Sequence, residues 1–204
     1  LKELERRGYP FARFELSSLG LTQTSDMTIR YRFSPGPRIT IEEIRLVGNK
    51  VTQDYVIIRE LGIETGDLYN EEKVGRIPTR LMRLGTFRRV DPPQVYYIDN
   101  SAGGLMIRVE EGPSSRFDGV LGYNPGTGSE GGYFTGLLDI SLGNLLGTGR
   151  ALKAHWQKRD RKTQELAFHY KEPWLFGYPV HVGAGFEQLI QDTTYVQREI
   201  SLDV

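Results

Sequence analysis

The sequence predicts two structural parts in series: an α+β module with the element order β-α-α-β-β, followed by an antiparallel all-β segment. Three observations lead to this fold class. A partial internal repeat returns after 76–77 residues, which is the size of a small domain. Helical periodicity is confined to one stretch inside the second copy. After residue 112, alternation of apolar and polar residues replaces it.

The repeat consists of two matched stretches. Residues 4–16 (LERRGYPFARFEL) align with residues 81–93 (LMRLGTFRRVDPP), and residues 29–38 (IRYRFSPGPR) align with residues 105–114 (LMIRVEEGPS). In each copy a glycine is followed by basic and aromatic residues, and a Gly-Pro pair closes the copy. The first copy has only the end of a helix and two strands. We therefore predict that residues 1–37 are the C-terminal part of a preceding module.

The second copy, residues 38–112, predicts a complete module. It opens with a strand over 38–48 (RITIEEIRLVG), which is rich in isoleucine and ends at a Gly-Asn turn signal. A helix is expected next, with Thr52 as its cap and Asp54 favourable in its first turn. The residues expected on its buried face are Ile57, Ile58 and Leu61.

A second helix is expected after Asn70, a good N-cap residue, and should end near Gly85. Pro78 lies inside this helix and is expected to kink it or split it in two. Strands over 94–99 (QVYYID) and 104–111 (GLMIRVEE) follow, joined by a turn at 100–103. The apolar stripe of the helix, at steps of three and four, is Val74, Ile77, Leu81 and Leu84.

The remainder, residues 113–204, predicts strands without helices. About six segments of roughly ten residues alternate between an apolar face and a polar or small face. This alternation is typical of strands in a membrane β-barrel. A soluble antiparallel sandwich alternates in the same way, so the pattern alone leaves both architectures open. We place the boundary between the two parts at residues 112–115.

Composition excludes several classes of protein. The 26 basic and 26 acidic residues balance, which gives no electrostatic argument for nucleic-acid binding. The chain has no cysteine, and hence no disulfide framework and no thiolate site. No apolar run reaches the roughly 20 residues of a spanning helix, and residues 1–30 lack a signal-peptide pattern. Because the chain starts at Leu1 rather than at methionine, we expect a piece of a longer or processed protein.

Two patterns that resemble catalytic or nucleotide-binding motifs are better explained as structure. The stretch GTGSEG (126–131) matches the dinucleotide pattern G-x-G-x-x-G, but a strand rather than a helix follows it, so we interpret it as a turn. The acidic pairs at 42–43 and 110–111 lie in strands, where neighbouring side chains point to opposite faces. Neither pair is therefore a catalytic dyad.

The three histidines also favour a structural interpretation. His155, His169 and His181 are expected on the polar faces of three successive strands, and spacing fixes no carboxylate partner for them. The sequence therefore predicts no catalytic residue, no metal site and no cofactor.

Residues 38–112 resemble a POTRA domain, the periplasmic module of outer-membrane assembly factors. The similar stretches are IRLVGNKVTQDYVI, LYNEEKV, LMRLGTFRRV and the closing VEEGP. Residues 143–157 (GNLLGTGRALKAHWQ) and 166–180 (LAFHYKEPWLFGYPV) resemble the first barrel strands of the BamA/TamA superfamily. The resemblance implies that residues 113–204 are the N-terminal part of a transmembrane β-barrel. It also implies a bacterial-type outer membrane, with the POTRA modules in the periplasm.

The chain departs from the family pattern in two respects. Pro78 is unexpected in the second POTRA helix. The arginine-bearing motif of a later barrel loop would lie beyond Val204.

If these strands cross a bilayer, one face contacts lipid. The stretch EPWLFGYPV (172–180) would then be a rigid turn at the barrel rim, because aromatic rings favour the membrane–water interface. Its prolines stiffen the turn, and Gly177 admits unusual backbone dihedrals. The predicted lipid-facing and interface residues are Phe134, Leu138, Ile140, Trp156, Phe168, Tyr170, Trp174, Phe176, Tyr178, Val182 and Phe186, with Leu152, Leu166 and Val180 in the same apolar set.

By resemblance, the strand within residues 92–100 (PPQVYYIDN) lies at the edge of the POTRA sheet. An edge strand leaves N–H and C=O groups unpaired, so it can accept a further strand from another chain. A protected edge without a partner is the alternative. The predicted client-binding residues are Val95, Tyr96, Tyr97 and Ile98.

The resemblance implies a non-enzymatic factor for assembly and insertion of outer-membrane proteins. POTRA modules would hold unfolded clients, and the barrel would assist insertion because a strand in lipid needs its backbone paired. The first barrel strand, 115–124, would form one side of a weakly paired seam at Gly119 and Gly122. The implied partners are unfolded outer-membrane protein clients, outer-membrane lipid and accessory periplasmic lipoproteins, without nucleic acid.

Three alternatives stay open at this point. The chain could come from a two-partner secretion transporter of the same superfamily, or from the barrel portion of a secreted lipase-like enzyme fusion. It could also be a soluble β-sandwich with an adaptor module.

Overall fold

The computed structural model describes residues 1–21, 27–99, 101–127, 131–192 and 195–204. Asn100 of the expected turn and residues 128–130 of the GTGSEG stretch lie outside this description. By its internal contacts the chain divides into two compact units. The first consists of residues 1–49, 57–83 and 89–110, and the second of residues 50–56, 84–88 and 111–204.

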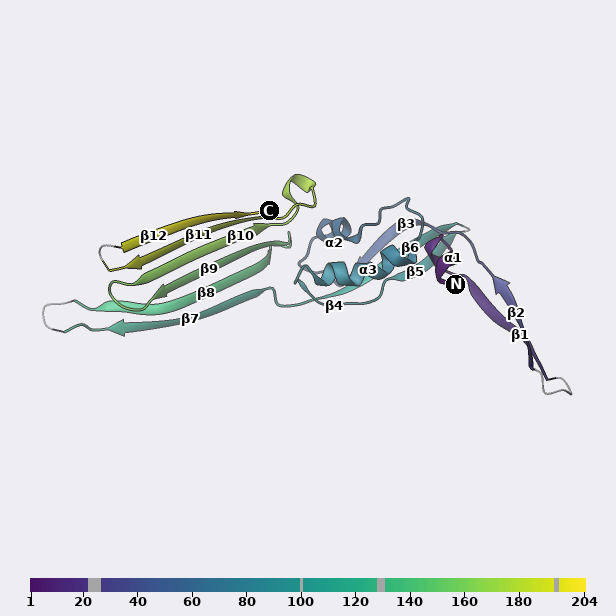
Figure 1. The fold of residues 1–204 in the computed structure, drawn as a ribbon, viewed down its shortest axis with the longest axis horizontal. Coiled ribbons are helices and arrows are strands. Elements are labelled where there is room, and N and C mark those ends of the chain that lie inside the picture. Colours follow the sequence, from purple (N-terminus) through teal and green to yellow (C-terminus); the bar gives the residue numbers. More distant parts are fainter. Residues whose placement is uncertain (22–26, 100, 128–130, 193–194) are drawn as a thin grey trace. The chain divides into compact units, whose positions relative to one another are not determined.

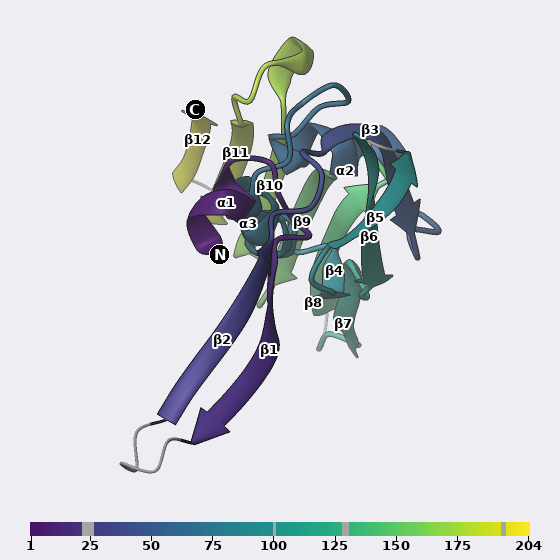
Figure 2. The same cartoon turned by 90° about the vertical axis from the view of Figure 1, so that its right-hand side faces the viewer.

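The N-terminal part is a short helix followed by a long hairpin. Helix α1 (Lys2–Arg6) precedes β1 (Arg13–Leu21) and β2 (Met27–Ser34), which pair antiparallel with one register shift (Figure 2). Apolar side chains face one another across the two strands, and the rings of Phe14 and Phe33 have centroids 5.0 Å apart. This helix–strand–strand order is the one expected for the incomplete first copy.

The complete module is a mixed sheet with β6 (Ala102–Glu111) at its centre. Strand β3 (Thr40–Val47) pairs with β6 in parallel, and β5 (Gln94–Asp99) pairs with it antiparallel. A short strand that the sequence did not predict, β4 (Phe87–Val90), also neighbours β6. Pro92 and Pro93 separate β4 from β5, since proline has no N–H to donate to a ladder.

Two helices supply the other half of the module's core. They are α2 (Asp54–Leu61) and α3 (Glu71–Met82). Burial of each large aliphatic side chain contributes about 1.5–3 kcal/mol to stability. The fully buried side chains are Ile39, Ile41, Val56, Ile57, Leu61, Ile77, Leu81, Leu105 and Ile107.

The prediction that Ile58 of α2 lies in the core is wrong. Ile58 is 43% exposed, and Val56 is buried beside Ile57 and Leu61. A helix advances by about 100° per residue, so the two neighbours of Ile57 point in different directions and only one can face the sheet.

Helix α3 has the predicted cap and three residues of the predicted stripe, but Leu84 lies beyond its last residue and Pro78 does not split it. Asn70 adopts an extended backbone, and its side-chain oxygen accepts a 3.1 Å hydrogen bond from the N–H of Lys73. The helix continues through Pro78 to Met82, so the expected split does not occur. A proline at this position removes only one intrahelical hydrogen bond, and the buried stripe on the same helix outweighs that loss. The buried residues are Val74, Ile77 and Leu81.

The described residues after 112 form six antiparallel strands that are neighbours in chain order (Figure 1). They are β7 (Ser115–Asn124), β8 (Tyr133–Leu145), β9 (Arg150–Lys158), β10 (Gln164–Glu172), β11 (Val182–Gln191) and β12 (Tyr195–Asp203). The prediction of six strands is thereby confirmed. Among the described residues of this segment, the only helical element is the 3₁₀ turn η1 (Leu175–Gly177). No helix in the described part of the chain has the length and apolar character needed to span a membrane.

Candidate functional site

Strand β5 lies at the edge of the module's sheet. In the described residues its strand partner is β6, with Val95 opposite Leu105, Tyr96 opposite Gly104, and Tyr97 opposite Gly103. The register shifts between Tyr97 and Asp99, so the regular pairing expected through residue 98 ends one residue earlier. Tyr97 is 51% exposed and Ile98 is 47% exposed.

Tyr96 lies flat across the central strand of this sheet. Its ring occupies the space above Gly104, where a Cβ atom would overlap it, and its hydroxyl donates a 2.7 Å hydrogen bond to Glu43 on β3. Arg45 donates to the same carboxylate at 3.0 Å, and its guanidinium carbon lies 5.5 Å from the Tyr96 ring centroid. Gly104 therefore allows an aromatic ring to connect both edges of the sheet on one face.

The ionisation of this group follows from these contacts. The Tyr96 hydroxyl, with a smaller contribution from Arg45, holds the pKa of Glu43 below its usual value. Partial burial, and then the bond to Glu43, raises the pKa of Tyr96. At neutral pH the pair is a neutral phenol donating to a carboxylate.

On the opposite face of β5, Tyr97 meets an aromatic residue from the N-terminal part. The Phe11 and Tyr97 rings have centroids 5.9 Å apart with an interplanar angle of 67°, an edge-to-face arrangement. Phe11 follows α1 and precedes β1. The two faces of the edge strand therefore differ: one is polar and aromatic, the other purely aromatic.

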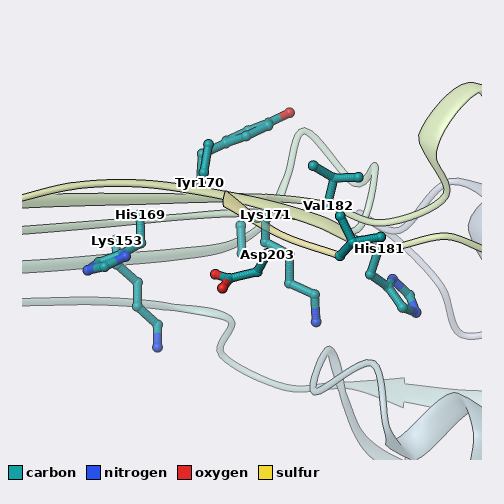
Figure 3. Close-up of a pocket in the computed structure, with 11 residues that line it drawn as sticks. Lys153, His169, Tyr170, Lys171, His181, Val182 and Asp203 are labelled. Atoms are coloured by element: carbon teal, nitrogen blue, oxygen red, sulfur yellow. The ribbon is translucent and has the colours of Figure 1, made fainter. Parts of the chain in front are cut away.

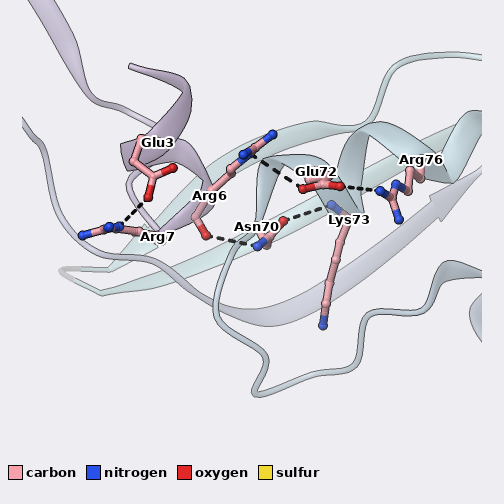
Figure 4. Close-up of polar contacts among 7 residues, drawn as sticks. All are labelled: Glu3, Arg6, Arg7, Asn70, Glu72, Lys73 and Arg76. Carbon is pink, nitrogen blue, oxygen red and sulfur yellow. Dashed lines mark hydrogen bonds and ion pairs between the residues drawn. The ribbon is translucent and has the colours of Figure 1, made fainter.

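The end of α1 is tied to the module by three successive carbonyl groups. The Arg6 carbonyl accepts a 3.1 Å hydrogen bond from the Asn70 side-chain amide, as Figure 4 shows. The Arg7 carbonyl accepts from the Arg38 guanidinium at 3.3 Å, and the Gly8 carbonyl accepts from the Ile39 N–H at 2.8 Å. These carbonyls have no partner inside a helix that is ending, so the module supplies their donors.

Exposed charged residues surround the contact between the end of α1 and the module. Figure 4 shows Arg6 directed toward Glu72, at 3.7 Å, while Arg76 pairs with the same carboxylate. Such exposed pairs contribute little individually. The hydrogen bonds that Asn70, Arg38 and Ile39 donate to backbone carbonyls therefore hold the end of α1 against the module.

Glu111, the last residue of β6, holds the loop before α2. Its carboxylate accepts hydrogen bonds from the N–H groups of Lys50, Val51 and Thr52 at 2.7–3.1 Å. Partial burial raises the pKa of Glu111, but the Thr52 hydroxyl and the three N–H groups outweigh that effect, so the net pKa is lowered. The sequence patterns placed Glu111 in the VEEGP stretch and in a non-catalytic acidic pair but did not predict this role, although an acid that closes a strand beside a Gly-Pro turn was a usable signal.

The Thr52 hydroxyl makes a second contact within the same unit. It accepts a 2.9 Å hydrogen bond from the Asn144 side-chain amide, and both side chains are buried. The Gln53 N–H donates to the Gly147 carbonyl at 2.9 Å. A Cβ atom at Gly147 would overlap the Val51 carbonyl, so this turn needs glycine for close approach.

The ladder registers of β7–β12 sort the side chains into two faces. A single cross-strand row is apolar from end to end and contains Phe117, Ile140, Ala154, Phe168, Phe186 and Ile200. The adjacent row on the other face contains Asp118, Asp139, His155, Ala167, Glu187 and Glu199. The strand residues of the predicted apolar set, including Phe134, Leu138, Trp156 and Tyr170, share the first face. Their contact with lipid stays a prediction.

The polar face carries paired histidines. His155 Nδ1 lies 2.6 Å from Asp139 Oδ1, and His169 Nε2 lies 3.3 Å from Glu187 Oε1. Figure 3 shows Lys153, Lys171 and Asp203 on the same side of the sheet, with Tyr170 and Val182 on the other.

A hollow of ≈ 540 Å³ lies at this end of the sheet, and its polar lining includes Lys153, His169, Lys171 and Asp203. Within the described residues, no three potential ligands come together as a metal site would require. Two residues differ from expectation: Val180 and His181 precede β11 instead of lying in it.

The aromatic stretch 172–180 is a strained turn between β10 and β11. Trp174 and Phe176 both adopt the left-handed region, with φ of 62° and 53°, in addition to Gly177 at 84°. Each non-glycine residue in this region costs on the order of 1–3 kcal/mol. Phe176 is 91% exposed, and the Leu175 N–H donates to the Val180 carbonyl at 2.9 Å. The sequence predicted the glycine's conformation but not that of the two aromatic residues.

Comparisons with known proteins agree with both halves of the chain. A family model described as POTRA, surface antigen variable number repeat, matches residues 39–112. The outer membrane protein assembly factor BamA of Neorickettsia risticii is 33% identical over 130 residues, which cover 64% of this chain and 17% of that protein. The BamA of Neisseria meningitidis serogroup B is 27% identical over 194 residues, which cover 90% of this chain and 23% of that protein. The chain thus spans less than a quarter of the length of these curated relatives.

A solved structure shows the same fold over almost the whole chain. The crystal structure of BamA from Haemophilus ducreyi lacking POTRA domains 1–3 has a TM-score of 0.69 at 21% identity. The match covers 98% of this chain and 38% of that structure. The module followed by a six-stranded antiparallel sheet is therefore a known arrangement.

Proposed function

Because this chain belongs to the BamA family of outer-membrane proteins with POTRA domains, we propose that it is part of a non-enzymatic factor that assembles outer-membrane proteins. The module over 38–112 binds unfolded clients by adding one of their strands to the β5 edge. Strands β7–β12 begin a barrel in the outer membrane that assists insertion, and the module lies in the periplasm. The partners are unfolded outer-membrane proteins and outer-membrane lipid.

The observation that carries this proposal is the one-sided pairing of β5. Its partner in the described residues is β6, while Tyr97 and Ile98 are about half exposed. A strand edge of this kind presents N–H and C=O groups at alternate residues, and an extended chain can pair with them whatever its side chains. The membrane-spanning segments of outer-membrane proteins become extended strands whose backbones need such pairing.

The apolar face of β7–β12 supports the membrane part of the proposal. The row through Ile140 and Phe168 continues across all six strands, and the opposite face is charged. A sheet with this alternation suits a barrel with lipid outside and water inside. Strand β7, which contains Gly119 and Gly122, pairs with β8 in the described residues, and its other edge is proposed as one side of the seam.

The test is a proline scan of β5 in the full-length protein. A photo-crosslinking residue at Ile98, which has no partner in the β6 ladder, reports client binding. Proline is introduced singly at Val95, Tyr96 and Tyr97. Where the N–H points outward, proline should leave the module folded and abolish client crosslinking. Where the N–H points to β6, it should disturb the module itself.

The control is Tyr97→Phe, which keeps the backbone and should crosslink like the wild type. Undiminished crosslinking in every proline variant that remains folded would remove the strand-addition mode. The family membership would be unaffected by that result.

A further inference from the structure

The two faces of the β5 edge differ in a way that bears on which client strands bind. On one face, Tyr97 and Phe11 form an edge-to-face aromatic pair whose ring centroids are 5.9 Å apart, and half of the Tyr97 surface is exposed. We call this pair the aromatic notch. On the other side, Tyr96 is held against Gly104 by Glu43 and faces Arg45.

The aromatic notch is fixed in place before any client arrives. Phe11 follows Gly8 by three residues, and the Gly8 carbonyl is bonded to the Ile39 N–H. Phe11 also packs against Gly36, where even a Cβ atom would lie within 3.3 Å of the Phe11 side chain. A surface that is already ordered loses little conformational freedom on binding, so its contacts are available for affinity.

A strand added to β5 places alternate side chains on the two faces of the sheet. Side chains on one face therefore lie beside the aromatic notch. On the other face the Tyr96 ring lies over Gly104 and reaches toward Glu43 on β3, away from the added strand. Cross-strand aromatic contacts are favourable, and a large apolar residue would cover exposed apolar surface of Tyr97. The other face offers no matching aromatic contact, because Tyr96 is held over Gly104 by its hydrogen bond to Glu43, so a large apolar residue gains less there.

On these grounds we propose that the β5 edge selects client strands in which large apolar or aromatic residues alternate with polar ones. The aromatic notch contacts the apolar set. This inference rests on the proposed function and adds to it the residues that set specificity among client strands, since the residues of a transmembrane β-strand alternate with period two. Phe11 and Tyr97 are then specificity-determining residues, and the backbone of β5 supplies the general affinity.

The test compares two peptides of identical composition and of about ten residues, the length of a membrane strand. One alternates aromatic and polar residues; in the other the same residues are sorted into an aromatic block and a polar block. Binding to the full-length protein in lipid nanodiscs is measured by fluorescence anisotropy. Binding of each peptide to protein-free nanodiscs is subtracted, because peptides of equal composition can differ in amphipathicity and hence in partition into lipid. The alternating peptide should bind about three- to tenfold more tightly, as expected for one or two aromatic contacts.

Variants assign this preference to the aromatic notch. Phe11→Ala should remove most of the preference by weakening the alternating peptide alone, and Phe11→Leu should retain part of it. The matched control is Phe14→Ala, which truncates another exposed aromatic, 55% accessible and paired with Phe33 on the β1–β2 hairpin. The control should keep the full preference.

Equal affinity of the two peptides, or equal effects of the Phe11 and Phe14 substitutions, would overturn the selection by alternation. Failure of the proposed function gives a different result. In that case proline at 95–97 would leave binding of both peptides unchanged. If proline abolishes binding of both peptides while their affinities are equal, strand addition stands and only the selectivity is lost.

Discussion

Replacing Glu111 by glutamine or alanine should loosen the loop that leads into α2. The carboxylate accepts from three consecutive N–H groups, those of Lys50, Val51 and Thr52, at 2.7–3.1 Å. A hydrogen bond to a charged acceptor contributes about 1.5–3 kcal/mol, and partial solvent exposure reduces the sum well below three times that value. We expect Glu111→Ala to lower the free energy of opening this loop by about 2–3 kcal/mol, and Glu111→Gln by about half as much.

The assay is amide hydrogen exchange of the full-length protein in detergent micelles, followed by mass spectrometry over residues 50–53. A loss of about 1.4 kcal/mol in local opening free energy accelerates exchange about tenfold. Glu111→Gln should therefore raise exchange by about a factor of ten, and Glu111→Ala by about a hundred. The control is Glu110→Gln, because Glu110 points to the opposite face of β6. Unchanged exchange in both Glu111 variants, or equal acceleration by the control, would refute the assigned role.

The same contact predicts a pH dependence. The pKa of Glu111 is lower in the folded protein than its unfolded value of about 4.3. Its stabilisation is therefore complete above that value and is lost as the pH falls through the lower, folded pKa. Protection factors at residues 50–53 should converge between wild type and Glu111→Gln in that acidic range, and should differ most at neutral pH.

Three further substitutions test other parts of the structure. Asn70→Ala, which loses both the helix cap and the bond to α1, should destabilise by about 2 kcal/mol in urea unfolding; Asn70→Asp, which keeps the cap, should cost about half. Equal losses would contradict the two separate bonds. Gly104→Ala should displace the Tyr96 ring and return its raised pKa toward the ordinary value near 10 in an ultraviolet titration. Ile140→Arg should impair insertion into vesicles by about 2–4 kcal/mol, whereas Ser141→Arg on the polar face should not.

Local sequence patterns predicted the elements that depend on local chemistry. The apolar residues at steps of three and four predicted helix α3, and the residue type of Asn70 predicted its cap. The alternation of apolar and polar residues predicted the six strands and their two faces. Val56, not Ile58, is buried in α2, because a pattern of consecutive aliphatic residues does not determine which neighbour faces the sheet. Periodicity identifies the buried face of a helix reliably where a long apolar stripe fits only one orientation. It is weak where two adjacent residues could each occupy the buried face.

Contacts made by close approach between distant segments could not be predicted. Tyr96 and Glu43 are 53 positions apart and meet only because Gly104 between them lacks a side chain. The left-handed conformations of Trp174 and Phe176 likewise depend on closure of the whole turn and contradict local preference. The candidate edge at 94–99 was placed by resemblance, whereas the contribution of Phe11 to that edge requires the fold of the preceding segment.

The regular ladders of β7–β12 restrict how this part of the protein can change length during evolution. Pairing continues without a register shift from β7 to β8 and from β9 through β12, with one shift near the end of β8. One residue inserted inside a strand would exchange the faces of every residue beyond it, moving His155 or Asp139 among the apolar residues. Insertions and deletions among homologues should therefore be confined to the connections between strands, and the strand lengths should be preserved.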